Sequence, residues 1–256
     1  MNDLLSIPEV FLRLHRAGRF DYWGVPYRSL TDGQRAERMR THLARVLWWR
    51  SIEWDRAPDQ IIGFQGDDFL RPGLIPFAGT GYGDYYCWYP RWQEAPEPPV
   101  VLCLHDEQES PLFARNLVEC LCRCFLQDFA HKDADDETWQ IVDPSELWDA
   151  HFEILRPFLN PAQISLLRSV RSKLSKAACL DADQAIAEAV GTRTLIGFQL
   201  PTRYADDEIG DRTVVLRLYD QSIAFFRELV EVEGLGRFRP MLAEAEANRA
   251  AVADRG

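Results

Sequence analysis

The stretch LIPFAGTGYGDYYCWYP, residues 74–90, decides the fold of this chain. Glycine stands at alternate positions from 79 to 83, and a run of aromatic residues follows. A dinucleotide-binding loop requires a helix directly after its glycines, because the helix N-terminus holds the phosphates. The run after these glycines, YYCWY at 85–89, instead favours a strand. We therefore interpret residues 79–84 as a tight turn between two strands, in which Asp84 accepts hydrogen bonds from turn amides.

Further strands are predicted on both sides of this hairpin, because short β-branched or aromatic runs bounded by Gly, Pro or Asp continue from about 60 to 106. The segment PRWQEAPEPP, residues 90–99, has four prolines and predicts a surface connection between strands. The segment 110–130 predicts a helix with Ser110 as its N-cap and Pro111 in its first turn. It is apolar over most of its circumference, so we expect it to pack on the sheet.

Helix patterns occupy most of the remaining chain, with apolar residues at helical spacing and an N-cap at Asp143. The expected helices span 6–18, 34–54, 143–155, 160–174, 181–191, 222–234 and 238–253, and the segments 194–201 and 212–219 are strand candidates. The pattern predicts an α+β fold, with a mainly antiparallel central sheet, helices packed on one side and a mostly helical C-terminal portion. The expected division is 1–135 for the α+β domain and 136–256 for the helical extension, with one shared core as the alternative.

The net charge of −11 disfavours direct binding of nucleic acid and favours a basic partner. A solvating role for the same charge is the alternative. No apolar run is long enough to span a membrane, and no secretion signal is visible, so we expect a cytoplasmic protein. The six cysteines are then expected to be reduced, buried thiols.

Two consecutive stretches resemble the SMI1/KNR4 (SUKH) superfamily: GDDFLRPGLIPFAGTGYGDYYCWYP (66–90) and PPVVLCLHDEQESPLFARNLVECLCRCF (98–125). The resemblance lies in Ile75-Pro76-Phe77-Ala78, the turn ending in Gly83-Asp84, the strand Tyr86-Cys87-Trp88, and the strand from Val100 to Asp106. It covers roughly residues 55–130. The N-terminal signature of the family is not evident, and residues 140–256 have no counterpart in it.

The resemblance implies a non-catalytic binding protein, above all an immunity protein that blocks a cognate bacterial toxin by occluding its active surface. The implied partner is a protein toxin, for example a basic nuclease whose cleft an acidic surface complements. A cytoplasmic regulatory or scaffolding adaptor is the alternative. No cofactor, metal or membrane partner is expected, and the oligomeric state is left open.

The expected partner-binding residues are large aromatic anchors and carboxylates near the same strand ends. Core packing is the alternative for the aromatic residues, because alternation along a strand turns about half of them inward. Turn capping is the alternative for the carboxylates. The candidates are Tyr82, Trp88, Tyr89 and Trp92, together with Asp67, Asp68, Asp84, Asp106 and Glu107.

A cysteine-dependent hydrolase is the catalytic alternative, because Cys103, His105 and Asp106 are close in sequence. Cys103 and His105 share a strand face, while Asp106 points to the other face. No glycine pattern typical of an oxyanion hole surrounds Cys103. Among Cys120, Cys122 and Cys124, the middle thiol points away from the other two on a helix, which disfavours a metal site.

Overall fold

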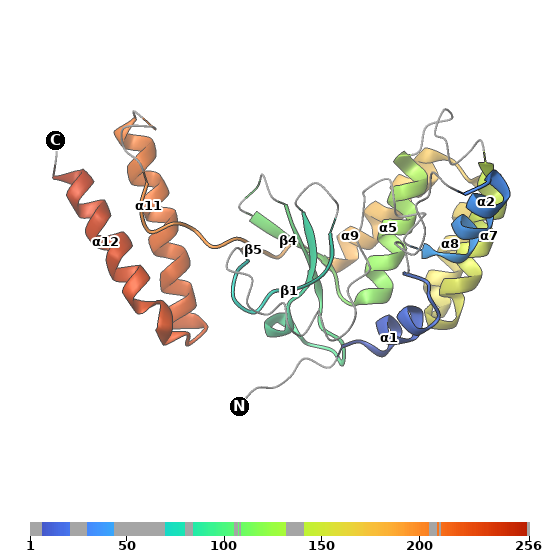
Figure 1. Ribbon diagram of the computed structural model, residues 1–256, viewed down its shortest axis with the longest axis horizontal. Helices are drawn as coiled ribbons and strands as arrows, with labels where there is room; N and C mark the ends of the chain where they lie inside the picture. Colours follow the sequence, from blue (N-terminus) through green and yellow to red (C-terminus); the bar gives the residue numbers. More distant parts are fainter. Residues whose placement is uncertain are drawn as a thin grey trace. The chain divides into compact units, whose positions relative to one another are not determined.

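The computed structural model describes residues 7–20, 30–43, 70–79, 84–104, 107, 109–131, 141–204, 209 and 211–254. The chain divides into two compact units, Met1–Gly197 and Phe198–Gly256. The fold is α+β, as the sequence predicts, with an antiparallel sheet and helices in the first unit and helices in the second (Figure 1). The division between the units lies at residue 197, whereas residue 135 falls within the first unit.

The sheet in the first unit is an antiparallel meander with the strand order β1-β2-β3-β4-β5. Its first hairpin confirms the two expected strands, because Gly79 pairs with Tyr85 and Ile75 pairs with Trp88. The turn itself, residues 80–83, lies outside the described residues. The strands span Ile75–Gly79 (β1), Tyr85–Trp88 (β2), Val100–Cys103 (β3), Glu109–Ala114 (β4) and Thr194–Ile196 (β5).

Strand β4 corrects the prediction of a helix beginning at Ser110. Residues 109–111 pair with β5, and Leu112 pairs with Val101 of β3. Pairing with β3 begins only at Leu112, so the missing N–H of Pro111 interrupts no hydrogen bond of that ladder. The helix begins instead at Leu117, where the Asn116 side chain accepts a hydrogen bond from the backbone N–H of Glu119 (2.9 Å).

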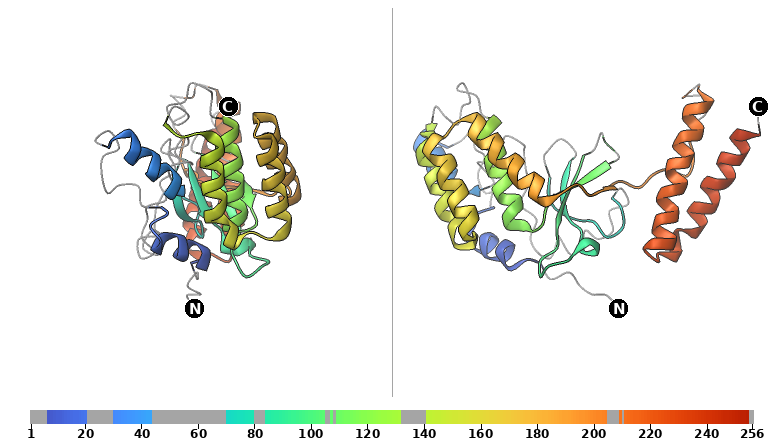
Figure 2. Two further views of the ribbon diagram at one scale, coloured as in Figure 1. Left: turned by 90° about the vertical axis from the view of Figure 1, so that its right-hand side faces the viewer. Right: turned by 180° about the vertical axis from the view of Figure 1, so that it is seen from behind.

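Helix α5 (Leu117–His131) is buried along almost its whole length, as its apolar circumference predicts. Together with α1 (Glu9–Arg16) and α9 (Lys176–Val190) it lies on one side of the sheet (Figures 1 and 2). Aromatic rings fill the space between sheet and helices: Trp88 stacks on Phe77 at 4.4 Å, and Phe11 meets Trp88 edge-on at 5.4 Å. The core of the first unit therefore includes both the sheet and the helices around it.

Further helices in the described part of the first unit extend this core beyond α5. The expected N-cap Asp143 accepts hydrogen bonds from Ser145 and Glu146, and Asn160 forms a capping box with Gln163. Buried Trp148 packs against Phe125 of α5 with a ring separation of 4.5 Å. These helices share one core with the sheet. They span Asp32–Thr41 (α2), Pro144–Leu155 (α7), Arg156–Phe158 (η5) and Pro161–Lys173 (α8).

The described residues of the second unit form two long helices, α11 (Arg212–Arg227) and α12 (Arg239–Ala253). The expectation of a strand at 212–219 is wrong, because this segment opens α11. The helix has Asp211 as its N-cap and buries residues at helical spacing, among them Val215, Tyr219 and Phe226. A π-helical segment, Glu228–Val232 (η6), and a short 3₁₀ turn, Gly236–Phe238 (η7), follow α11. In the part of the chain that the structure describes, no helix is long and apolar enough to span a membrane.

Candidate functional site

The sequence-predicted site residues fall into three groups in the structure. Four of them, Asp67, Asp68, Tyr82 and Asp106, lie outside the described residues, as does His105 of the alternative hydrolase site. Trp88 and Tyr89 are buried, and Asp84, Trp92 and Glu107 are at least partly exposed.

The burial of Trp88 and Tyr89 corrects their prediction as surface anchors. Trp88 has no exposed surface, and Tyr89 is 2% exposed. The sequence argument expected one face of this strand to be open, whereas residues on both faces of β2 are buried. These two rings therefore stabilise the fold and are not available to a partner.

The remaining candidates do not gather at one end of the sheet. Tyr85 pairs with Cys103, so Asp84 and Glu107 flank one end of the β2–β3 pair. Trp92 follows the other end, where Trp88 pairs with Val100. Three residue steps of a strand separate these ends by about 10 Å. The expectation that charges and aromatic anchors share the same strand ends is therefore wrong for these residues.

Trp92 lies in the connection between β2 and β3, which crosses the surface as its prolines predict. Pro90 begins the 3₁₀ turn Pro90–Trp92 (η4), and the N–H of Trp92 donates to the Tyr89 carbonyl (3.1 Å). The Trp92 ring packs edge-on against the buried Tyr89 ring at 5.1 Å. The turn thus holds a partly exposed indole on a rigid support.

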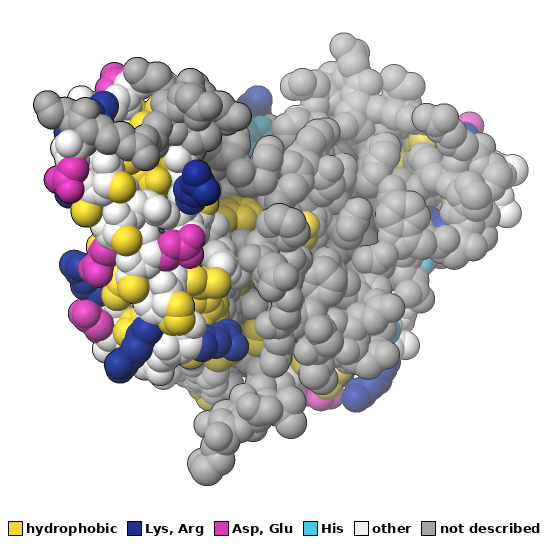
Figure 3. Space-filling model, turned by 60° about the vertical axis from the view of Figure 1, so that its left-hand side comes forward, with side chains coloured by type: hydrophobic (Ala, Val, Ile, Leu, Met, Phe, Trp, Pro, Cys, Tyr) yellow, Lys and Arg dark blue, Asp and Glu magenta, His cyan; other side chains and the backbone are white. Residues whose placement is uncertain are grey.

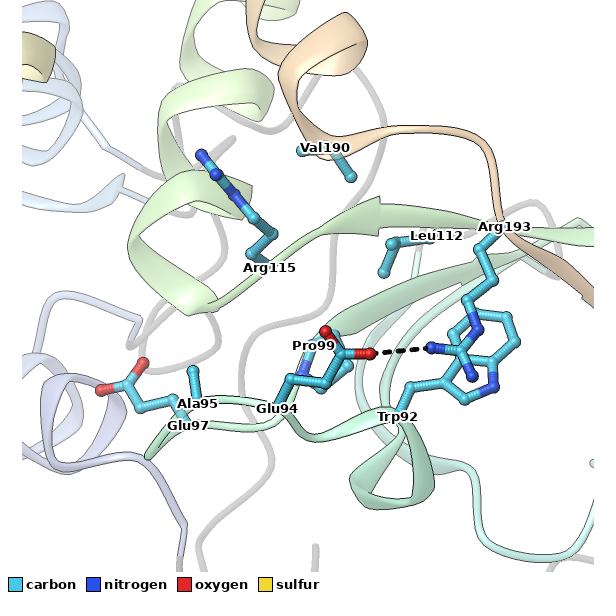
Figure 4. Close-up of a pocket in the computed structure, with 9 residues that line it drawn as sticks. All are labelled: Trp92, Glu94, Ala95, Glu97, Pro99, Leu112, Arg115, Val190 and Arg193. Carbon is cyan, nitrogen blue, oxygen red and sulfur yellow. Dashed lines mark hydrogen bonds and ion pairs between the residues drawn. The ribbon is translucent and has the colours of Figure 1, made fainter.

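A pocket of about 200 Å³ opens beside this indole (Figure 4). Three segments that are distant in sequence contribute to it: the β2–β3 connection, the end of β4 with the residue after it, and the end of α9 with the segment that leads to β5. We call this cavity the Trp92 pocket. It is lined by Trp92, Glu94, Ala95, Glu97, Pro99, Leu112, Arg115, Val190 and Arg193.

Trp92, Glu94 and Arg193 form one end of the Trp92 pocket (Figure 4). The Arg193 guanidinium lies over the Trp92 ring at 4.3 Å and pairs with the Glu94 carboxylate at 3.4 Å. The Glu94 side chain is 86% exposed, so this ion pair contributes little to stability. The guanidinium is held mainly by its stacking on the indole, which presents a flat, amphipathic surface to the pocket.

Arg115 and Glu97 lie at the opposite end of the pocket (Figure 4). The Arg115 guanidinium donates to the buried Glu119 carboxylate at 2.5 and 3.1 Å, and this hydrogen bonding raises the pKa of Arg115. Burial raises the pKa of the Glu97 carboxyl, and a hydrogen bond from the Leu117 backbone N–H at the start of α5 opposes that shift. Arg115 therefore has its own counter-charge, whereas Glu97 has no ion pair within the described part of the chain.

Sequence reasoning identified Trp92 but missed Glu97, Arg115 and Arg193. No local pattern joins residues 92–99 to residues 112–115 and 190–193, because the β4–β5 pairing brings these segments together. A usable signal was present at Trp92 itself. An aromatic residue within a proline-rich connection lies outside strand alternation and has no strand face to bury it.

The cysteines do not form a surface site in the described structure. Cys103 is fully buried, and its thiol lies 3.8 Å from the Cys87 sulfur. Burial raises the pKa of Cys122 to about 12 and of Cys179 to about 11, which keeps both as weakly nucleophilic thiols. Within the described residues, His, Cys, Asp and Glu side chains form no group able to hold a metal ion.

On the face shown in Figure 3, the described basic and acidic side chains are not separated into patches of one sign. There the described basic and acidic side chains lie interspersed among hydrophobic ones. The net charge of −11 therefore does not locate a site on this face. Comparison with protein-family models, curated proteins and solved structures gave no match.

Proposed function

We propose that this chain is a non-catalytic, cytoplasmic binding protein that neutralises a cognate bacterial toxin by covering the active surface of the toxin. The observation that carries the proposal is the hairpin of β1 and β2, followed by β3. It forms from the same segments that carry the SMI1/KNR4 resemblance. Because a fold does not determine a function, the resemblance supports the proposal only by analogy.

The Trp92 pocket supports a binding role on physical grounds. Tryptophan and arginine are enriched where partner proteins bind most tightly, and here Trp92 and Arg193 are stacked at the rim of a cavity. Trp92 lies in η4, and Arg193 directly precedes β5, so neither side chain is carried by a long loop and little conformational entropy is lost on binding. Such a surface is suited to a protein partner.

The net charge supports a basic partner. A protein with a net charge of −11 attracts cationic partners over a distance of about one Debye length, roughly 8 Å at physiological salt. Association with a basic toxin would therefore slow as the salt concentration rises, while a neutral partner would show little dependence.

The experiment is co-expression of the chain in bacteria with the toxin encoded by the adjacent reading frame. We expect growth to be restored and the two proteins to co-purify, with an association rate that falls between 50 and 500 mM salt, a range of about tenfold in ionic strength. Failure to protect against that toxin, together with the absence of a stable complex, would overturn the proposal. If the chain instead bound several partners weakly and did not protect the cells, the result would indicate a regulatory or scaffolding adaptor.

A matched pair of variants tests whether the Trp92 pocket forms the contact. Trp92→Ala removes the partly exposed indole, and we expect it to weaken the complex by about 2 kcal/mol or more, roughly 30-fold. Leu180→Ala removes an exposed apolar side chain from α9 of the same unit and should leave the affinity unchanged. Equal effects of the two variants would exclude the pocket from the interface.

A further inference from the structure

Only some of the charged side chains that line the Trp92 pocket have an oppositely charged partner among the described residues. Arg115 is bound to Glu119, and Arg193 is bound to Glu94 and stacked on Trp92. Glu97 has no such partner among the described residues: its carboxylate accepts a hydrogen bond from the Leu117 N–H, a neutral donor. A partly buried carboxylate without a counter-ion is poorly solvated, and a cation at hydrogen-bonding distance would relieve that deficit.

The size of the cavity limits what it can admit. Pockets for cofactors and drug-sized ligands measure about 300–1,000 Å³, whereas the Trp92 pocket measures about 200 Å³. It has room for a single long side chain. Pro99, Leu112 and Val190 supply apolar lining, against which the alkyl part of a lysine or arginine would pack while its charged end reaches a carboxylate.

We propose that the Trp92 pocket receives one cationic side chain, arginine or lysine, of the partner protein, and that the Glu97 carboxylate is its counter-ion. The inference rests on the proposed function for the identity of the partner as a protein. An anionic ligand is disfavoured, because Arg115 is bound to the buried Glu119 carboxylate and the Arg193 guanidinium is stacked on Trp92 beside Glu94. The net charge of −11 is complementary to the same basic partner.

The test uses the full-length chain and two small probes, with no toxin present. The probes are N-acetyl-arginine amide and the uncharged N-acetyl-norleucine amide, which has an alkyl side chain of similar kind. Binding is followed by the NMR signals of the Trp92 indole N–H and of the Leu117 backbone N–H, which donates to Glu97. We expect the arginine probe to shift both signals saturably and the norleucine probe to shift them little.

Two variants identify the counter-ion. Glu97→Gln keeps an oxygen for the Leu117 N–H but removes the charge, and we expect it to weaken binding of the arginine probe about tenfold. Glu109→Gln removes an exposed carboxylate on β4, outside the pocket, and should change the affinity less than about twofold. Spectra unchanged away from the pocket establish that each variant is folded.

Three results would overturn the inference: no shift of the two reporter signals, equal shifts with both probes, or undiminished binding to Glu97→Gln. Each of these would leave the proposed function standing if the chain still protects cells against the toxin. Conversely, selective binding of the arginine probe without any protection would support the inference and count against the toxin-neutralising function.

Discussion

The carboxylate of Asp183 on α9 joins this helix to α5 through a buried polar network. Asp183 accepts hydrogen bonds from Arg123 Nε (2.7 Å), Arg123 Nη2 (3.3 Å) and Gln127 Nε2 (2.7 Å). The same guanidinium donates to the carbonyl of Phe113 in β4 (2.7 Å) and lies over the Phe113 ring at 4.2 Å. Both side chains of the ion pair are only 12% exposed. The network therefore connects two helices and the sheet in a largely buried environment.

Replacing Asp183 by alanine leaves the Arg123 charge buried without its counter-ion. Removing one partner of such a pair costs about 3–5 kcal/mol. For a unit of 197 residues, each kcal/mol lowers the melting temperature by about 2–4 °C, so Asp183→Ala should lower it by roughly 6–20 °C. All eight tryptophans lie at or before residue 148, so tryptophan fluorescence during urea or thermal unfolding reports on the first unit alone.

The matched control is Asp149→Ala, which removes the exposed pair formed by Asp149 and Arg171 at 2.7 Å. This pair is accessible to solvent, so its loss should cost at most about 1 kcal/mol. The reasoning would be refuted if the two variants unfolded within 1 kcal/mol of each other, a difference that ordinary chemical denaturation resolves. In that case packing, rather than this network, holds α9 on α5.

Three further outcomes are expected. Gly197→Ala should lower the melting temperature of the first unit severely. A Cβ atom at position 197 would lie 1.9 Å from Ser110 Oγ and 2.8 Å from Ser110 Cβ. A variant as stable as the original protein would contradict this geometry. Glu97→Gln should raise the melting temperature at pH 7 but not below pH 4. Burial raises the pKa of Glu97 in the folded state, so the carboxyl destabilises the fold only at pH values where it is ionised. An equal gain in melting temperature at both pH values would contradict this reasoning. Cys122 and Cys179 should react with a disulfide reagent at pH 8 only after unfolding. Burial raises the pKa of the Cys122 thiol to about 12 and that of the Cys179 thiol to about 11. Rapid labelling of the native protein would contradict this burial.

The parts of the fold that were predictable depend on local chemistry. Glycines followed by strand-forming residues specified the hairpin of β1 and β2, and Asp143 before Pro144 specified the start of α7. The local sequence led to the wrong prediction at Ser110-Pro111, because this pair is compatible with the start of a helix and also with the start of a strand. The deciding interaction was the pairing of residues 109–111 with β5, more than 80 residues later in the chain.

The candidate site was less predictable than the fold, for a related reason. Strand alternation identified which aromatic residues share a face but not that both faces of β2 are covered, so Trp88 and Tyr89 were misassigned to the surface. Trp92 was identified because it lies outside the strand. The charged residues around it come from segments that only tertiary structure brings together, and a single sequence contains no signal for that proximity.

The late position of β5 in the chain has a consequence for synthesis on the ribosome. Glu109 of β4 pairs with Ile196, so 87 further residues must be added before its partner strand exists. At about 5–20 residues per second, translation leaves this edge of the meander without β5 for roughly 4–17 s. An unpaired strand edge can form hydrogen bonds with a strand of another chain. We therefore expect this protein to be most prone to aggregation on polysomes, where several nascent copies lie close together. A nascent-chain chaperone that shields β4 during that interval should raise its soluble yield.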